Sequence, residues 1–425
     1  MAVLAGCLYA FSGFTVYNVF FNHFVDVVAL FPYLLWTLDE AVLHKRRGPF
    51  AALVALNLVN NYFFFAGQVV FLLLYFICMT ASGVYRWRGK TFGALAAESL
   101  LGCGMGCVLA WPALLSLSQN PRTVDPFSGF GYIFYSKAQQ YGAILYSLFF
   151  PPDCPYMPVI FDEGVIKWTS MSAYLPLMGM AGVIAYLRCT QKTAFRRILF
   201  SCLVMALVPA LNSAFYAMNS SYYARWWYMP ILVMCAASVQ ALENEGIDPA
   251  KGVRPTVAVL LAFCVFAFLP VEEDGEWSLG VIEYPEKFWL NLGLALLGVA
   301  VFWLVWVQYR RRPLLARRCW PSAAFTASPT SPSASSPSGR TTPAGVPSSM
   351  RTPAPWRKSC RRARTASTTT SATTMWACGW ARAACSFSTP PWPPPSWSST
   401  PSSASSGTCA ASRLPLCSPC GACWR

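Results

Sequence analysis

The polar residues best suited to chemistry lie where one long apolar run gives way to the next. Asn22, His23 and Asp26 stand close together at such a boundary. A carboxylate a few residues inside a membrane span is costly and is usually retained for function, so Asp26 could act as a base beside His23 or bind a divalent cation. Capping is the alternative, because Asn22 or Asp26 could satisfy free N–H groups that open a helix. We favour capping for Asn22 and function for Asp26.

A second group of function-capable residues contains Tyr222, Tyr223 and Arg225. The guanidinium of Arg225 could clamp a lipid phosphate with two parallel hydrogen bonds, since arginine presents a planar fork of donors. The alternative is an arginine that snorkels to the lipid headgroups and has no specific ligand. Arg122 offers another guanidinium in the longest polar segment, residues 116–169.

Side-chain amides form a third group around Asn60 and Asn61. Asn57 and Asn61 fall one turn apart on a helix, so they would share a face. Such amides could bond between helices or line a polar cavity.

These residues are set in a strongly apolar chain of 425 residues, of which 55% are hydrophobic and 12% charged, with a mean hydropathy of +0.42. A soluble globular protein could not bury that much apolar surface. A run of about 20 apolar residues spans a bilayer core. Residues 1–312 therefore predict an all-α polytopic membrane helix bundle of about ten transmembrane helices. The ten runs are Val3–Phe20, Phe24–Val42, Phe50–Phe65, Val69–Val84, Phe92–Leu115, Ser170–Leu187, Ile198–Met218, Trp227–Leu242, Thr256–Leu269 and Phe288–Val307.

The basic residues between these runs predict the orientation of the bundle. Cytoplasmic loops concentrate Lys and Arg, and alternate loops of residues 1–312 hold fifteen such residues against five in the intervening loops. Both ends of this region are therefore expected in the cytoplasm, and the segment 116–169 on the outer face.

Three glycines, Gly102, Gly104 and Gly106, are spaced two residues apart within one apolar run. A nucleotide-binding loop would need a preceding strand. The glycines instead predict close helix packing, because small residues let two membrane helices approach each other.

The tail, residues 313–425, differs in composition from the rest of the chain. It holds twelve basic residues, no Asp or Glu, and no Asn, Gln, His, Tyr or Ile. Six of these seven absent types have adenine at the second codon position, which indicates a frame-shifted translation of a GC-rich gene. A disordered Ser/Thr/Pro stalk is the competing interpretation, and either way a disordered tail is expected. Because the basic excess lies in the tail, it does not indicate a nucleic-acid partner.

Three motifs in residues 1–312 resemble the YfhO family of bacterial polytopic membrane proteins. They are F-F-N-H-F-V-D-V-V-A-L-F-P at Phe20–Pro32, K-W-T-S-M-S-A-Y-L-P-L at Lys167–Leu177 and Y-A-R-W-W-Y-M-P at Tyr223–Pro230. The resemblance implies a fold similar to GT-C glycosyltransferases. It also implies an enzyme that adds sugars from a polyprenyl-phosphate donor to a cell-wall polymer such as lipoteichoic acid.

The resemblance gives roles to the residues named above. Arg225 would bind the donor's phosphate, Asp26 would orient an acceptor or a metal ion, and the amides of Asn22, Asn60 and Asn61 would hold sugar hydroxyls. Arg122, His23, Tyr222 and Tyr223 would complete the site. The hairpins around Asp26, Asn61 and Arg225 are then expected to converge on one cleft beneath residues 116–169.

The resemblance also implies that parts of the family's pattern are missing. Family members place a catalytic acid in the loop after their first helix, whereas this chain begins near what should be a later helix. Their large outer C-terminal region is replaced here by the tail. We therefore expect a truncated, frame-shifted and inactive product.

A transporter or lipid flippase, and a non-enzymatic membrane scaffold, are the alternatives. Ion-coupled transport usually needs charges near the bilayer midplane and repeated broken helices. Asp26, Asp39, Glu40 and Glu98 all lie within about two turns, roughly 11 Å, of a predicted span end, and no internal repeat is visible. These features make a transporter less favoured than an enzyme, and no residue argues directly against a scaffold.

Overall fold

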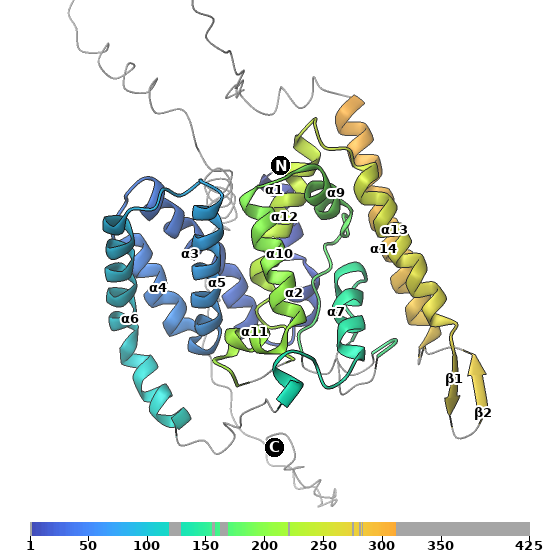
Figure 1. Ribbon diagram of the computed structural model, residues 1–425, viewed down its shortest axis with the longest axis horizontal. Coiled ribbons are helices and arrows are strands. Elements are labelled where there is room, and N and C mark those ends of the chain that lie inside the picture. Colours follow the sequence, from blue (N-terminus) through green and yellow to red (C-terminus); the bar gives the residue numbers. More distant parts are fainter. Residues whose placement is uncertain are drawn as a thin grey trace, which may run out of the picture. The chain divides into compact units, whose positions relative to one another are not determined.

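The computed structural model describes residues 2–118, 129–154, 158–161, 169–219, 222–273, 276–279, 282 and 284–311. They lie within one compact unit, a bundle of α-helices with one antiparallel β-hairpin (Figure 1). The predicted tail lies outside the described residues. In chain order the elements are α1 (Ala2–Ala10), α2 (Gly13–Tyr17), α3 (Asn22–Leu43), α4 (Pro49–Asn60), α5 (Tyr62–Ala81), α6 (Gly89–Ser118), η1 (Gly129–Tyr132), α7 (Gln139–Phe149), α9 (Ala181–Cys189), α10 (Ala194–Leu207), α11 (Pro209–Ser213), η2 (Ala214–Tyr216), α12 (Tyr228–Glu243), α13 (Ala250–Ala267), β1 (Pro270–Glu273), β2 (Glu276–Leu279) and α14 (Pro285–Arg311).

The prediction of a helical membrane protein is confirmed, but fewer helices than ten are long enough to cross a membrane. Within the described ranges, α5, α6, α13 and α14 are long and apolar enough. A fifth span results if α10 and the segment after it, bent by 106°, are counted together. Several predicted runs are too short as helices, because α4 has 12 residues and α12 has 16, and a span needs about 20.

The run at Ser170–Leu187 departs furthest from its prediction as a membrane helix. The chain is not helical from Thr169 to Met180, and α9 occupies only the last part of the run. Ser170 and Leu177 have φ values of 58° and 60°, a left-handed conformation that breaks a helix and that residues other than glycine adopt at a cost. The outer segment contains the opposite departure, since α7 is a helix that no apolar run predicted.

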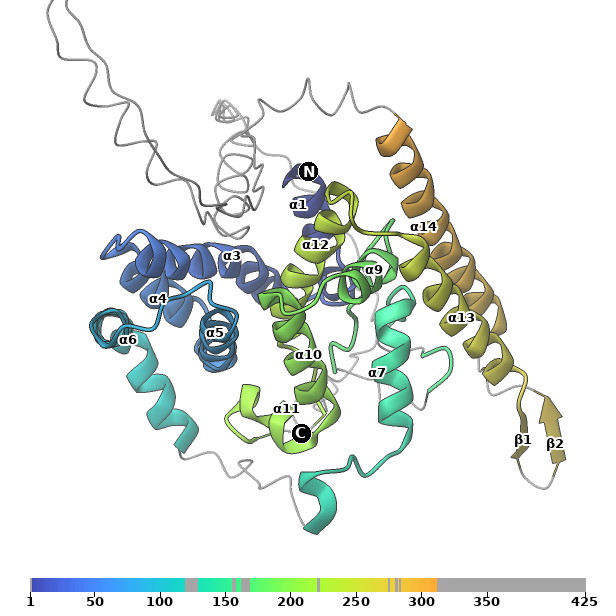
Figure 2. The same ribbon diagram turned by 45° about the horizontal axis from the view of Figure 1, so that its top comes forward.

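One end of α3 lies beside α12 near the centre of the bundle (Figure 2). Aromatic side chains of these two helices and of α5 contact one another. The Phe31 ring on α3 contacts Phe71 on α5 and Tyr228 on α12, with centroids 5.5 and 5.4 Å apart. Phe14 on α2 adds a contact to Tyr228 at 5.6 Å. Edge-on aromatic pairs of this kind contribute about 0.5–1.5 kcal/mol beyond the area that they bury.

Acidic residues at the inner end of the bundle are buried and paired. Asp39 accepts hydrogen bonds from the Tyr75 and Tyr85 hydroxyls. Glu40 lies 3.2 Å from the Arg46 guanidinium, and Glu98 lies 3.3 Å from that of Arg47. These contacts fasten the loops after α3 and α5 to the helices beside them. The pairing offsets the cost of burying charge, as a buried carboxylate requires.

The glycines of α6 form its contact with α4, as their spacing predicts. A Cβ atom at Gly102 would lie 2.5 Å from the Ala51 carbonyl oxygen, and one at Gly106 would lie 2.6 Å from Leu58 Cδ2. Gly104 faces open space, because a Cβ atom added there would have no neighbour within 4 Å among the described residues. Two of the three glycines therefore permit the close approach of the helices.

This difference predicts unequal effects of two similar substitutions. Gly102→Ala should destabilise the folded protein by about 1–3 kcal/mol, because the new methyl group meets a backbone oxygen that cannot move aside. Gly104→Ala on the same helix is the matched control and should leave stability unchanged or slightly raised. Thermal unfolding in detergent micelles measures both, and equal midpoints for the two variants would contradict the packing.

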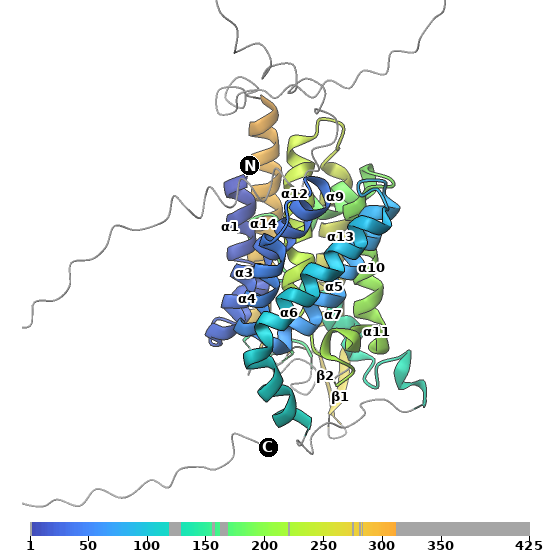
Figure 3. The ribbon, with the colours of Figure 1, turned by 90° about the vertical axis from the view of Figure 1, so that its left-hand side faces the viewer.

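The basic loops gather at one end of the bundle, as Figures 1 and 3 show, where α14 ends and α1 begins. The turn from α9 to α10 lies there, whereas η1, α11 and the β-hairpin lie at the opposite end. From the distribution of Lys and Arg we expect the first end to be cytoplasmic, and we call it the inner end and the opposite one the outer end.

A reporter fused after Arg197 should therefore read cytoplasmic, and one fused after Lys137 should read external. Paired alkaline phosphatase and green fluorescent protein fusions report the two sides with opposite signals. The reverse pattern at both positions would overturn this orientation.

Candidate functional site

Arg225 lies at the outer end of the bundle among aromatic rings from three parts of the chain. Its Cζ atom is 4.3 Å from the centroid of the Tyr223 ring, 5.5 Å from that of Phe24 on α3 and 6.0 Å from that of Phe63 on α5. We call these four residues the arginine site. Aromatic faces attract a cation by about 0.5–2 kcal/mol each, which holds the guanidinium in place without neutralising it.

The guanidinium of Arg225 has an unused donor. Its Nε atom is buried, and no residue that the structure describes accepts a hydrogen bond from it. A buried donor without a partner costs about 1–3 kcal/mol. The charge is also unpaired by any acid in the described part of the chain. An anion bound at this position would satisfy both the donor and the charge.

The loop before α12 is held rigidly, which fixes the position of Arg225. The Trp226 indole stacks on the Phe215 ring at 3.9 Å and donates a 2.6 Å hydrogen bond to Asn212 Oδ1. Asn212 Nδ2 donates in turn to the Tyr223 carbonyl at 3.0 Å. Ala217, at φ 50°, turns the chain out of η2 in a left-handed conformation. This turn costs about 1 kcal/mol or more in backbone strain.

The hairpins that carry Asp26, Asn61 and Arg225 contact one another through the aromatic residues close to Asp26 and Asn61 in the chain. Phe24 follows His23, and its ring packs edge-on against Phe64, 4.7 Å away. Asn61 caps α5, since its Oδ1 accepts a hydrogen bond from the Phe64 N–H at 3.2 Å. Asn57 on α4 donates to the Leu53 carbonyl of its own helix.

The other predicted residues surround this meeting point or lie beyond it. Asn22, His23, Asp26 and Asn60 are exposed, and no contact in the described ranges joins Asp26 to Arg225. His23 packs edge-on against Phe24 with centroids 4.6 Å apart. The Tyr222 hydroxyl is 3.3 Å from that of Tyr223. Arg122 and part of the expected cap lie outside the described residues.

Capping of α3 by Asn22 is wrong. The helix begins at Asn22 itself, with Phe21 in the capping position, where its side chain makes no capping hydrogen bond. The packing of Phe21 against Phe24, with ring centroids 5.2 Å apart, fixes the start of the helix instead. The Asn22 amide is consequently exposed at the outer surface.

A second polar cluster, which we call the Asp153 cluster, was not predicted from the sequence. Asp153 Oδ1 accepts hydrogen bonds from Asn291 Nδ2 at 2.9 Å and from the Tyr146 hydroxyl at 3.3 Å. Its Oδ2 accepts from the Val159 N–H at 3.2 Å. Asp153 is 8% exposed, so a carboxylate in the outer segment is held almost wholly inside the protein. Its position after two consecutive prolines is the only local signal of a fixed conformation.

Burial raises the pKa of the Asp153 carboxyl from 3.8 to about 6. Desolvation is the main cause, because it disfavours the ionised form. The hydrogen bonds from Val159, Tyr146 and Asn291, and the charge of Lys287, act in the opposite direction. The carboxyl therefore titrates near neutral pH, as general acids and bases often do.

The non-helical segment after Thr169 joins the two clusters. The Thr169 carbonyl accepts a 2.7 Å hydrogen bond from the N–H of Ala224, next to Arg225. The Ser170 hydroxyl donates to Asn18 Oδ1 at 2.7 Å, and the Ala173 N–H donates to the Ser147 carbonyl on α7 at 3.0 Å. We call residues 169–174 the connecting segment, because it ties the arginine site to α7 and the Asp153 cluster.

The sequence matches the family described as bacterial membrane protein YfhO over residues 1–320. The chain belongs to this family. The match spans all of the described residues, including the arginine site, the connecting segment and the Asp153 cluster. It also agrees with the several apolar helices in identifying a membrane protein. No curated protein and no solved structure matches the chain.

Metal-binding side chains are sparse in the parts of this YfhO-family chain that the structure describes. No three His, Cys, Asp or Glu side chains there gather closely enough to hold a metal ion. A divalent cation at the site would be bound by Asp26 together with oxygens of a ligand. Mg²⁺ often binds in this way, through one or two carboxylates and a substrate phosphate.

The raised pKa of Asp153 predicts how stability depends on pH. The folded protein holds this proton more tightly than the unfolded chain, so the folded state loses stability as the pH rises from about 4 to about 6. The total effect is about 3 kcal/mol. Asp153→Asn cannot titrate, and its melting temperature relative to the parent protein should therefore rise between pH 4.5 and pH 7.

Glu286→Gln is the matched control, because Glu286 is an exposed acid at the same end of the bundle. Its melting temperature relative to the parent should stay nearly constant over this range. A constant difference for Asp153→Asn as well would show that the buried carboxyl titrates normally.

Proposed function

We propose that YfhO-family proteins transfer a sugar from a polyprenyl-phosphate donor to a cell-wall or teichoic-acid-type polymer on the outer face of the bacterial plasma membrane, and that this chain holds the donor-binding part of that site. One observation carries the proposal: an arginine without an acidic partner among the described residues, held by aromatic rings at the outer end of a membrane bundle. A snorkelling arginine would keep its head in water or headgroups. Arg225 instead has its Nε buried by protein.

A phosphate ester is the anion that best fits the arginine site. Guanidinium binds phosphate through two parallel hydrogen bonds, and such charge-assisted bonds are about twice as strong as neutral ones. Tyr222 and Tyr223 place hydroxyl groups beside Arg225. A tyrosine hydroxyl can both donate and accept hydrogen bonds. Those hydroxyls would bind the sugar of the donor, and the exposed amides of Asn22 and Asn60 would extend this surface.

In the proposed reaction a hydroxyl group of the acceptor polymer attacks the anomeric carbon of the donor sugar. A new carbon–oxygen bond forms while the bond between that carbon and the phosphate oxygen breaks, and its electron pair stays on the phosphate. Arg225 stabilises the negative charge that develops on the departing polyprenyl phosphate. The proton of the attacking hydroxyl passes to a base.

Asp26 and His23 are the proposed bases beside the arginine site. They lie three residues apart on the outer turn of α3, and both are exposed to an approaching polymer. His23 would accept the proton of the attacking hydroxyl, and Asp26 would orient the acceptor hydroxyl or share a cation with the phosphate. Phe24, between them in the chain, contacts Arg225, which keeps the bases near the phosphate site.

The pairing of the inner acids favours transfer over ion-coupled transport. A transporter needs carboxylates that can exchange ions along a pathway. Asp39 is instead bonded to two tyrosines, and Glu98 accepts hydrogen bonds from Arg47 and the Gly48 N–H. These acids have structural partners at the cytoplasmic end of the bundle.

Replacement of Arg225 tests the proposed phosphate site. Arg225→Ala should weaken the binding of polyprenyl phosphate by about 2–5 kcal/mol, or at least about 30-fold, because the anion loses its charged partner. Arg225→Lys should recover only part of the affinity, since lysine lacks the bidentate fork. Binding to the purified chain in detergent micelles measures the affinities.

Lys137→Ala, at another outer cation, is the matched control and should change the affinity little. Thermal unfolding adds a second readout, because Arg225→Ala loses the cation–π contacts but also removes a buried donor without a partner, so the melting temperature should change little. A destabilised Arg225→Ala with unchanged phosphate affinity would assign the arginine a structural role. Transfer of labelled sugar from the donor to polymer in membranes containing an intact YfhO-family protein tests the reaction itself, and export of donor without transfer would favour a flippase.

A further inference from the structure

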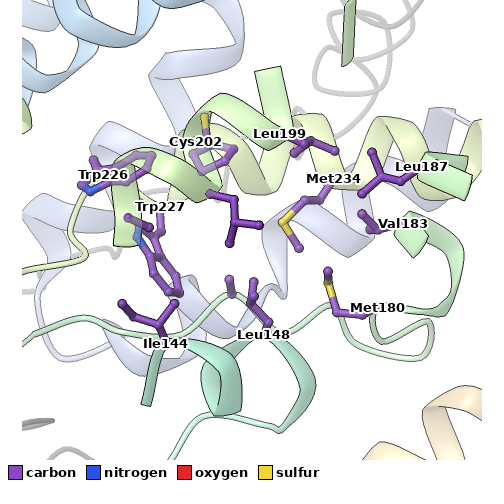
Figure 4. A pocket seen from close by; sticks show the side chains of 14 residues that line it. Ile144, Leu148, Met180, Val183, Leu187, Leu199, Cys202, Trp226, Trp227 and Met234 are labelled. Atoms are coloured by element: carbon purple, nitrogen blue, oxygen red, sulfur yellow. The ribbon is translucent and has the colours of Figure 1, made fainter. Parts of the chain in front are cut away.

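An apolar cavity of about 110 Å³ lies among α7, α9, α10, α12 and the connecting segment. Figure 4 shows the fourteen side chains that line it. They include Trp226 and Trp227 at one end and Val183 and Leu187 at the other. All of them are hydrocarbon or aromatic apart from the sulfur atoms of Cys202, Met180 and Met234.

The lining spans the depth of the bundle from its outer to its inner half. Trp226 precedes α12 directly after Arg225, at the outer end. Leu187 precedes Arg188, whose loop belongs to the basic inner end. A cavity drawn out in this direction follows the direction of a lipid chain in a bilayer. Leu203 on α10 is 39% exposed at its edge, which leaves an approach from the surrounding hydrocarbon.

Hydrocarbon is the occupant that suits these walls. Apolar cavities exclude water, and an engineered cavity of about 150 Å³ is known to bind benzene. The cavity here, at about 110 Å³, is of similar size and can therefore hold a small hydrocarbon group. Met180 and Met234 have flexible, polarizable side chains that adapt to an irregular ligand. The Trp226 N–H is bonded to Asn212, so the indole presents an apolar surface.

We propose that this cavity binds the isoprenoid chain of a polyprenyl phosphate, at the isoprene units nearest the phosphate. The inference rests on the proposed function for the phosphate, which would sit at Arg225, one residue from the cavity wall at Trp226. A polyprenyl phosphate has one chain and one anionic group. This composition matches an apolar cavity whose wall residue Trp226 directly follows, along the chain, an arginine that no described acid pairs, whereas a glycerophospholipid has a second chain for which this cavity offers no place.

Photolabelling of the full chain in detergent micelles tests this site. The probe is a polyprenyl phosphate without sugar that carries a diazirine on its second isoprene unit. We expect cross-links to peptides of α7, α10 and α12, identified by mass spectrometry. Unlabelled polyprenyl phosphate should compete, and phosphatidylglycerol at the same concentration should not. Cross-links confined to other helices, or equal competition by phosphatidylglycerol, would overturn the proposal.

Filling the cavity provides the matched comparison. Ala206→Phe places a ring in the cavity and should lower labelling roughly tenfold. Val204→Phe puts the same ring on the same helix at a 52% exposed position and should leave labelling unchanged. Ala173→Leu fills the cavity from the connecting segment, so that one poorly folded variant does not decide the result. Unchanged labelling in both folded filling variants would rule out the cavity.

The variants also separate this inference from the proposed function. Labelling that is lost in Ala206→Phe but retained in Arg225→Ala would keep the chain site and reject the phosphate site. Labelling that is lost only in Arg225→Ala would reject the chain site and keep the phosphate site. Neither outcome depends on sugar transfer, because the probe carries no sugar.

Discussion

The hydrogen bond from the Ala224 N–H to the Thr169 carbonyl joins the two halves of the outer face. The connecting segment cannot be helical and also reach both α7 and the loop before α12. Its left-handed residue Ser170 makes the turn, and the hydrogen bond to Asn18 holds that conformation. Gly13 allows the crossing, because a Cβ there would clash with the Ser172 hydroxyl. The positions of Arg225 and of the Asp153 cluster both follow from this crossing.

Acidic side chains have partners at the inner end of the bundle, whereas Arg225 at the outer end has no acidic partner among the described residues. The inner carboxylates have tyrosine or arginine partners, which makes them supports for the loops between helices. At the outer end, aromatic rings hold Arg225 by cation–π attraction and leave its charge uncompensated by any described acid. Proteins commonly accept a loss of stability at a binding site of this kind. The contrast sets the paired acids of the inner end apart from Arg225, at which we propose that the ligand binds.

Residue patterns that act locally were predictable from the sequence. The apolar runs located the long helices, and the glycine spacing located the contact of α6 with α4. Arg225 and Tyr223 of the arginine site were singled out from the sequence because their motif combines a guanidinium with phenols at a predicted span end. The aromatic neighbours Phe24 and Phe63 were not singled out, since each sits in an apolar run like many other phenylalanines.

Features that depend on distant parts of the chain were missed. The burial of Asp153 requires Asn291, 138 residues away along the chain, and no local pattern encodes that contact. The run at Ser170–Leu187 has the composition of a span, but hydrogen bonds to Asn18, Ser147 and Ala224 hold its first part in another conformation. Tertiary contacts outweigh local propensity here, as they commonly do.

The location of the apolar cavity bears on how a lipid substrate and a polar polymer could meet. Trp226 forms part of the cavity wall, and Tyr223 forms part of the arginine site, so both surfaces belong to one loop fixed by Asn212. A chain in the cavity and a phosphate at Arg225 would therefore be positioned by the same rigid element. Rigid placement of this kind lowers the entropy lost when reactants are aligned. In the proposed reaction the exposed groups of α3 would lie on the side from which the polymer arrives, and the loop before α12 would separate the lipid part of the substrate from the aqueous part.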